Sequence, residues 1–135
     1  MKALKIVAIV IVVYVGTVVT FESLAGYFQP AGGSTLVITT VDADGTPHDR
    51  VVARLSSDGH LYVASNHWAR GWYKRALAHP EVQVTLDGKK GDYTAVPVPD
   101  TGAERDRVER ENTLGVPFRI LTGFAPRHFV RLDPH

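Results

Sequence analysis

Residues 50–87 read RVVARLSSDGHLYVASNHWARGWYKRALAHPEVQVTLD, and this stretch decides the fold of the chain. Short runs rich in β-branched residues alternate here with turn residues, which predicts antiparallel strands joined by hairpins. Asp-Gly pairs at residues 58–59 and 87–88 lie beside apolar runs, and a third pair at 44–45 precedes the stretch. This dipeptide readily takes the positive φ angles of tight turns, so we expect a hairpin at each pair.

The rest of the chain continues this pattern. It predicts strands at about 35–41, 48–55, 61–65, 82–86, 92–97 and 128–132. Six strands with tight turns favour closure, because closure removes the exposed edges of a sheet. We therefore expect a mainly β protein with short helices, built as a six-stranded antiparallel split β-barrel that follows an N-terminal transmembrane helix.

Two short helices are expected beside the strands. The first covers about 70–78, where apolar residues recur at helical spacing. The second should begin at Thr101, because Thr101 and Glu104 fit a capping box, and it should continue to about residue 112. It has almost no apolar face, so we expect it to be solvated. The conformation of residues 114–125, which mix Gly, Pro and large apolar side chains, stays open.

The N-terminus carries the strongest signal in the chain. Residues 6–21 contain no charge, with Lys2 and Lys5 before them and Glu22 after them. Sixteen helical residues extend roughly 24 Å, against a hydrocarbon core of about 30 Å, and further apolar residues follow. A membrane span is therefore expected.

We expect an anchor over residues 1–29 and a barrel domain over 34–135. Two alternatives stay open for the first segment. It could be a cleaved signal peptide, since small residues stand at 23 and 25, or a core helix under a large partner surface. If it is an anchor, the lysines on its N-terminal side predict a cytoplasmic N-terminus and an external barrel.

Composition excludes several function classes. The 135-residue chain has a formal net charge of +1 and 21% charged residues, so nothing suggests a nucleic-acid partner. It has no cysteines, which excludes disulfides, thiolate metal sites and cysteine nucleophiles. The six histidines show no spacing typical of metal ligands, so no metal site is expected.

Two arginines are the first candidates for ligand binding. Arg50 and Arg54 are four residues apart, so on an extended strand both project from the same face. Each needs an anionic partner. That partner is either a carboxylate of the chain, such as Asp49, Asp87 or Asp92, or the phosphate of a ligand.

A second group of donors gathers where a strand gives way to the first helix. Ser65 and Asn66 end the strand, and Arg70, Gly71 and Trp72 open the helix. Helix N-termini attract anions through their free N–H groups, which indicates a phosphate site. The alternative is that Ser65 and Asn66 are only turn or capping residues.

The order of these motifs resembles the deazaflavin-dependent nitroreductase and quinone reductase family, within the split-barrel superfamily of the pyridoxamine-phosphate oxidases. The resemblance rests on Ala-Ser-Asn at 64–66, Gly-Trp-Tyr at 71–73 and Ala-His-Pro-Glu-Val at 78–82. Its specific part covers residues 50–84. The chain departs from the family at 67–68, where His-Trp replaces Gly-Gly and makes the loop bulkier, and in having His-Pro for Asn-Pro.

The resemblance implies a bound deazaflavin (coenzyme F-420 type) or FMN. Carried over by position, the cofactor-binding residues would be Arg50, Val51, Val52, Arg54, Ser65, Asn66, Arg70, Gly71 and Trp72. No catalytic side chain is obligatory in such chemistry. Tyr73 and Trp68 are candidates for contact with substrate, although aromatic residues at such positions more often belong to a core.

Three functions follow from these expectations. The first is an oxidoreductase at a membrane lipid surface that transfers a hydride to quinones or nitro compounds, in a chain that pairs as a homodimer like other split barrels. The second is a non-catalytic module that binds a flavin, heme or lipid. The third is a structural membrane-associated domain. The first conflicts with the external barrel predicted above, since the resemblance implies a cofactor made in the cytoplasm.

Overall fold

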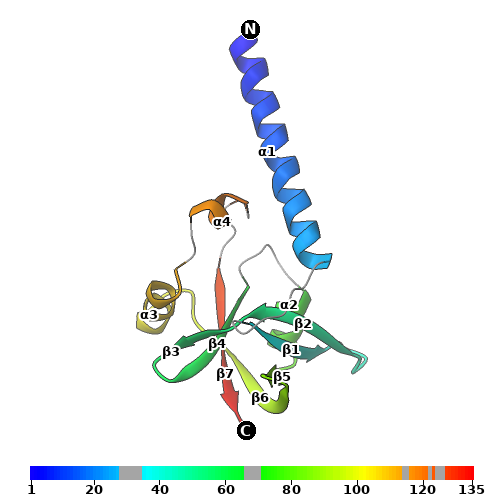
Figure 1. Ribbon diagram of the computed structural model, residues 1–135, viewed down its shortest axis with the longest axis vertical. Coiled ribbons are helices and arrows are strands. Elements are labelled where there is room, and N and C mark those ends of the chain that lie inside the picture. The colour runs from blue at the N-terminus through cyan, green and yellow to red at the C-terminus, as the bar shows by residue number, and fades with distance from the viewer. Residues whose placement is uncertain (28–34, 66–70, 114–115, 122, 124–126) are drawn as a thin grey trace.

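The computed structural model describes residues 1–27, 35–65, 71–113, 116–121, 123 and 127–135. In these ranges a long N-terminal helix stands away from a curled antiparallel sheet, two short helices lie beside the sheet, and a third, α4 (Val116–Leu121), lies between the sheet and the N-terminal helix (Figure 1). The helices are α1 (Lys2–Tyr27), α2 (Gly71–Ala78), α3 (Ala103–Glu111) and α4 (Val116–Leu121). The strands are β1 (Thr35–Val41), β2 (Pro47–Ala53), β3 (Leu55–Ser57), β4 (His60–Ser65), β5 (Glu81–Leu86), β6 (Lys89–Pro97) and β7 (His128–Pro134).

The described sheet has seven strands in the order β2-β1-β5-β6-β7-β4-β3. Strands β2 and β3 lie at its two ends, yet only Arg54 separates them along the chain. The sheet must therefore curl until its ends meet, which gives the antiparallel half-barrel in Figure 1. The predicted number of six strands was wrong because the strand expected at 48–55 is divided at Arg54, where its pairing changes from β1 to β4.

The Asp-Gly pairs form hairpin turns as predicted. Asp58 and Gly59 have φ angles of 51° and 75°, and Asp87 and Gly88 have φ angles of 50° and 83°. Positive φ at both central residues is typical of the type I′ turn, whose twist matches that of the flanking strands. These two turns fix the register of β3 with β4 and of β5 with β6.

The main core fills the inner face of the curled sheet. Helix α2 covers part of this face and contributes Trp72 and Ala76, which are 4% and 1% exposed. The strands supply the other buried residues, which are Leu36, Ile38, Val63, Val82, Val84, Ala95, Val130 and Leu132. The helix expected at 70–78 is thus confirmed, and packing on the sheet holds it in place.

A second, smaller core lies under α3 on the outer face of β4 and β7. It contains Tyr62, Phe129 and Val108, the last fully buried on α3. The expectation that this helix is solvated was therefore wrong, because Val108 packs into this core and Glu104 and Arg107 hydrogen-bond to the Tyr62 hydroxyl. Thr101 does not cap it either. The cap is Gly102, which has a φ angle of 125° and makes no side-chain capping bond, so the helix begins at Ala103, two residues later than expected.

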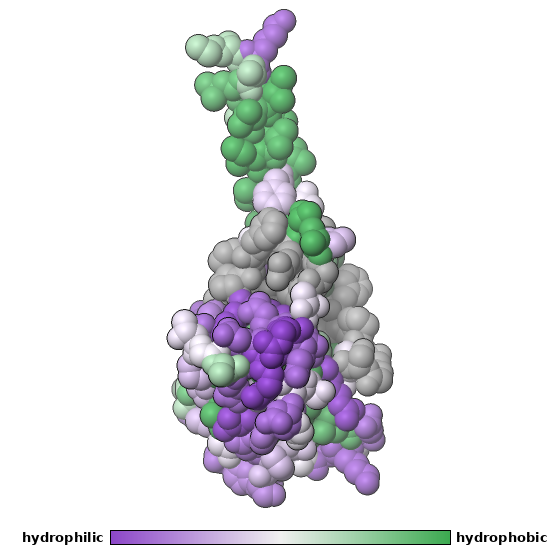
Figure 2. Space-filling model, turned by 90° about the vertical axis from the view of Figure 1, so that its left-hand side faces the viewer, coloured by the Kyte–Doolittle hydropathy of each residue, from purple (hydrophilic) through white to green (hydrophobic). Residues whose placement is uncertain are grey.

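Helix α1 is exposed along its length, as the apolar column in Figure 2 shows. Residues Lys2–Leu24 are long and apolar enough to cross a membrane, by length and composition, and none of this stretch is buried against the rest of the described chain. The described chain does not bury this helix, so a core helix would require a partner chain to cover it. The Tyr14 hydroxyl donates a hydrogen bond of 2.9 Å to the backbone oxygen of Ile120 in α4.

Candidate functional site

A gap in the ladder separates β2 from β4 in the part of the chain that the structure describes. There β2 pairs with β1, whereas β4 pairs with β3 and β7. Arg50 lies opposite Ile38 and Val52 lies opposite Leu36 in the β1–β2 register. Directly paired residues share a face, so both project toward the main core, and Val52 packs against it. Val51 projects from the other face.

The other side of this gap is formed by the end of β4 and the start of α2. Ser65 is the last residue of β4, is 2% exposed and lies opposite His128 of β7. Helix α2 begins at Gly71. Trp72 faces the core, where packing leaves little of its ring open to a ligand. The predicted site residues Asn66, Trp68 and Arg70 lie outside the described residues.

Tyr73 and His128 stack at this end of the barrel. Their ring centroids are 5.4 Å apart with an interplanar angle of 21°. Asp100 lies 3.1 Å from Nδ1 of His128, so the carboxylate can fix the orientation of the imidazole ring. Burial, and then the negative charge of Asp100, raise the pKa of Tyr73. The phenol therefore keeps its proton at neutral pH and remains a hydrogen-bond donor.

Arg75 adds a cation at the same helix start. Its Nε donates a hydrogen bond of 2.9 Å to the Thr40 hydroxyl, and a Cβ placed on Gly71 would lie 2.8 Å from its Nη1. The absence of a side chain at Gly71 thus lets the guanidinium fold back along the first turn. Sequence reasoning missed Arg75, although its spacing of one helical turn from Gly71 was visible. It also missed His128, which only the β4–β7 register brings beside Ser65.

The structure does not bring Arg54 to this end. Arg54 lines a different hollow with His60, at the start of β4, whereas Ser65 is at its end. Five strand residues separate the two positions by about 17 Å. Arg54 Nη1 lies 3.2 Å from the Asp87 carboxylate. Of the two partners considered for this arginine, the structure shows the carboxylate.

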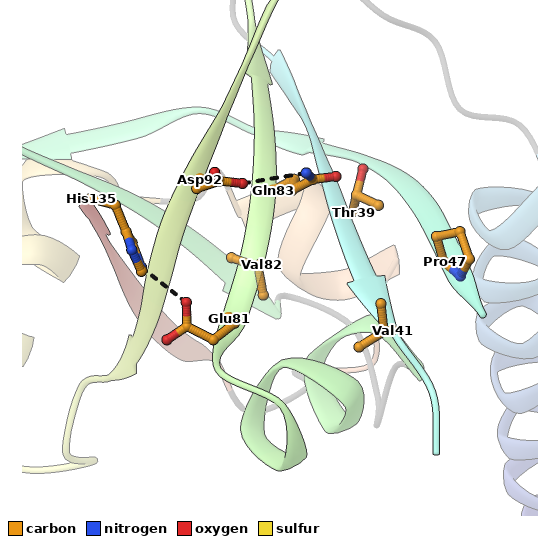
Figure 3. Close-up of a pocket in the computed structure, with 8 residues that line it drawn as sticks. All are labelled: Thr39, Val41, Pro47, Glu81, Val82, Gln83, Asp92 and His135. Atoms are coloured by element: carbon orange, nitrogen blue, oxygen red, sulfur yellow. Dashed lines mark hydrogen bonds and ion pairs between the residues drawn. The ribbon is translucent and has the colours of Figure 1, made fainter. Parts of the chain in front are cut away.

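A further hollow of about 400 Å³ opens on the outer face of β1, β5 and β6 (Figure 3). The side-chain amide of Gln83 donates a hydrogen bond of 3.3 Å to the Asp92 carboxylate, and Nε2 of His135 lies 3.0 Å from the Glu81 carboxylate. Two carboxylates among these side chains would repel an anionic cofactor. This hollow therefore does not fit the phosphate-bearing ligand that the sequence predicts.

Known structures share this fold at low sequence identity. HutZ, the heme storage protein from Vibrio cholerae, matches with a TM-score of 0.60 and 19% identity over 86% of each chain. A protein described as a domain-swapped dimer matches with a TM-score of 0.63 and 16% identity, covering 81% of this chain and 87% of the other. An F420-H2 dependent reductase, FDR-A, matches with a TM-score of 0.56 and 20% identity, covering 74% of this chain and 94% of the other.

Among curated protein sequences, none matches the chain. The family model of the F420H(2)-dependent quinone reductases, by contrast, matches residues 15–117. This match includes the gap between β2 and β4, all of α2 and the C-terminal half of α1. The chain belongs to the F420H(2)-dependent quinone reductase family.

Proposed function

We propose that this protein is a membrane-anchored oxidoreductase that uses a reduced deazaflavin to reduce quinones, with nitro compounds as further substrates. The family match over residues 15–117 carries the proposal. It also favours deazaflavin over FMN, because the family is named for the reduced deazaflavin. The bound ring supplies a hydride, and the protein supplies orientation and a dry pocket.

The donors at the gap between β2 and β4 fit an anionic cofactor. Arg50 offers a guanidinium on the inner face of β2, Ser65 a hydroxyl, and α2 the free N–H groups of its first turn at Gly71. Such groups suit a phosphate. Asn66 and Arg70 would complete this set, and the backbone at Val51 and Val52 would border the ring.

Tyr73 is our candidate for the proton donor. Reduction of a quinone adds a hydride and a proton and yields a hydroquinone. The raised pKa of Tyr73 keeps its hydroxyl protonated, so it can donate to the substrate oxygen that gains negative charge. Its stack on His128 fixes the direction of the ring. Trp68 stays a second candidate for contact with substrate.

Anchorage would bring the enzyme to its substrate. Lipophilic quinones partition into the bilayer, so an enzyme held there by α1 meets them at high local concentration. Lys2 and Lys5 favour a barrel on the external side of the membrane, whereas a cofactor made in the cytoplasm requires the barrel to lie on the cytoplasmic side. A reporter fused to the C-terminus measures which side the barrel occupies.

The test of the proposed function is a titration of the full chain, held in lipid nanodiscs, with reduced deazaflavin and with reduced FMN, followed by addition of menadione. We expect the deazaflavin to bind and menadione to be reduced. Arg50→Gln should weaken cofactor binding about tenfold, the loss typical of one charge-assisted contact. Arg110→Gln, which removes an exposed arginine of α3, is the matched control. Retention of neither cofactor would refute the proposal.

A second candidate is a binding module without turnover. It is favoured by the match to HutZ, a heme storage protein, over most of both chains. Retention of heme or of a flavin without reduction of menadione would support it. The match to a domain-swapped dimer supports a homodimer in either case, which the mass of the chain in nanodiscs would test.

A further inference from the structure

The end of the barrel interior away from α2 opens into a hollow that the proposed reductase site does not use. Its volume is about 550 Å³, within the range of small-molecule sites. We call it the Arg54 hollow, after the cation on its rim. The side chains that matter for its chemistry are Arg54, His60, Leu61, Leu86, Tyr93 and Leu132.

The floor of the Arg54 hollow is apolar and only partly covered. Leu132 is 1% exposed and belongs to the main core. Leu61, Leu86 and Tyr93 pack against that core but are half-buried, so part of each side chain faces the hollow. A ligand with an apolar body would remove this surface from water, at roughly 25 cal/mol per Å².

One fixed positive charge stands on the rim. Arg54 is the only lysine or arginine among the described residues that line the hollow. The ion pair with Asp87 competes only weakly with a ligand for Arg54. The two side chains are 37% and 74% exposed, and exposed ion pairs contribute little to stability. Asp87 lies in the type I′ turn and is not among the described residues that line the hollow. A carboxylate seated over the floor can take both N–H groups of the guanidinium fork and displace Asp87.

We propose that the Arg54 hollow binds a small amphipathic carboxylate, with its apolar body on the floor formed by Leu61, Leu86 and Tyr93 and its carboxylate on Arg54. The assignment gives a role to Arg54, which lies between β2 and β3 and which the proposed reductase site does not include. The break in pairing at Arg54 places the guanidinium at the barrel mouth, where the two ends of the sheet meet. This site is independent of the proposed cofactor site.

The test uses the full chain in nanodiscs and two probes of matched shape, phenylbutyrate and the uncharged phenylbutanol. Ligand-observed NMR measures binding of each against empty nanodiscs. We expect phenylbutyrate to bind about tenfold more tightly than phenylbutanol, as one charge-assisted pair would give. Arg54→Gln should abolish this difference. Lys90→Gln, which removes a cation of the β5–β6 hairpin that does not line the hollow, should leave it unchanged.

A second variant separates binding from misfolding. Asp87→Asn removes the competing carboxylate, so it should tighten phenylbutyrate binding several-fold and leave phenylbutanol binding unchanged. Loss of fold cannot imitate a gain in affinity. Equal binding of the two probes to the native chain, a charge preference that survives Arg54→Gln, or no gain with Asp87→Asn would each overturn the proposal.

Discussion

The substitution Val108→Ala tests how much the packing of α3 on the barrel stabilises the fold. It is the buried residue of that helix, fully covered among Tyr62, Ala64, Val98 and Phe129. Val108→Ala removes two methyl groups. At about 0.8 kcal/mol for each, plus a term for the cavity left behind, the free energy of unfolding should fall by about 2 kcal/mol. In a domain of this size that lowers the melting temperature by about 10 °C.

Thermal unfolding of the full chain in one detergent, followed by near-ultraviolet circular dichroism, measures this shift. Val116→Ala is the matched control, because Val116 is 64% exposed in α4 and the same change there should alter stability by less than about 0.5 kcal/mol. If the two variants had the same melting temperature, the packing of Val108 in the smaller core would not stabilise the fold, and the prediction would be refuted.

Two further predictions concern the surface around this helix and the hairpins. The pKa of Glu104 is lowered, first by the hydrogen bond from the Tyr62 hydroxyl and then by Arg131. Its charged form therefore stabilises the fold above the unfolded pKa near 4.5, and this stability is lost as pH falls through the lower folded value. Denaturant melts from pH 6 to pH 3 should thus show a smaller loss for Glu104→Gln than for the native chain, and equal losses would contradict the assignment. Gly88→Ala should cost about 1 kcal/mol, because a φ angle of 83° strains any side chain, whereas Gly16→Ala in α1, with open space around it and no such angle, should be neutral or better in the same melts.

Local chemistry predicted the hairpins and most strands. Strand β1 matches the expected range of 35–41, and the turns at 58–59 and 87–88 take the positive φ angles that Asp-Gly favours. The seating of α3 could not be predicted, because Val108 is the single apolar contact in a charged helix and only the tertiary fold shows what it meets. Residue spacing also gave no means to find His128, which joins the site through strands far apart in sequence.

Arg50 and Arg54 were expected at one site because of their spacing, but the structure separates them. Spacing of four residues does place Arg50 and Arg54 on the same side of an extended chain, but pairing changes between them, from β1 to β4. Roughly 13 Å of extended chain separates the two positions, so Arg50 lies on β2 opposite Ile38, whereas Arg54 lines the hollow at the start of β4. Under the two proposals, each ligand would therefore contact a different arginine. If a deazaflavin and an amphipathic carboxylate bound together without competing, this separation along the barrel would be the physical reason.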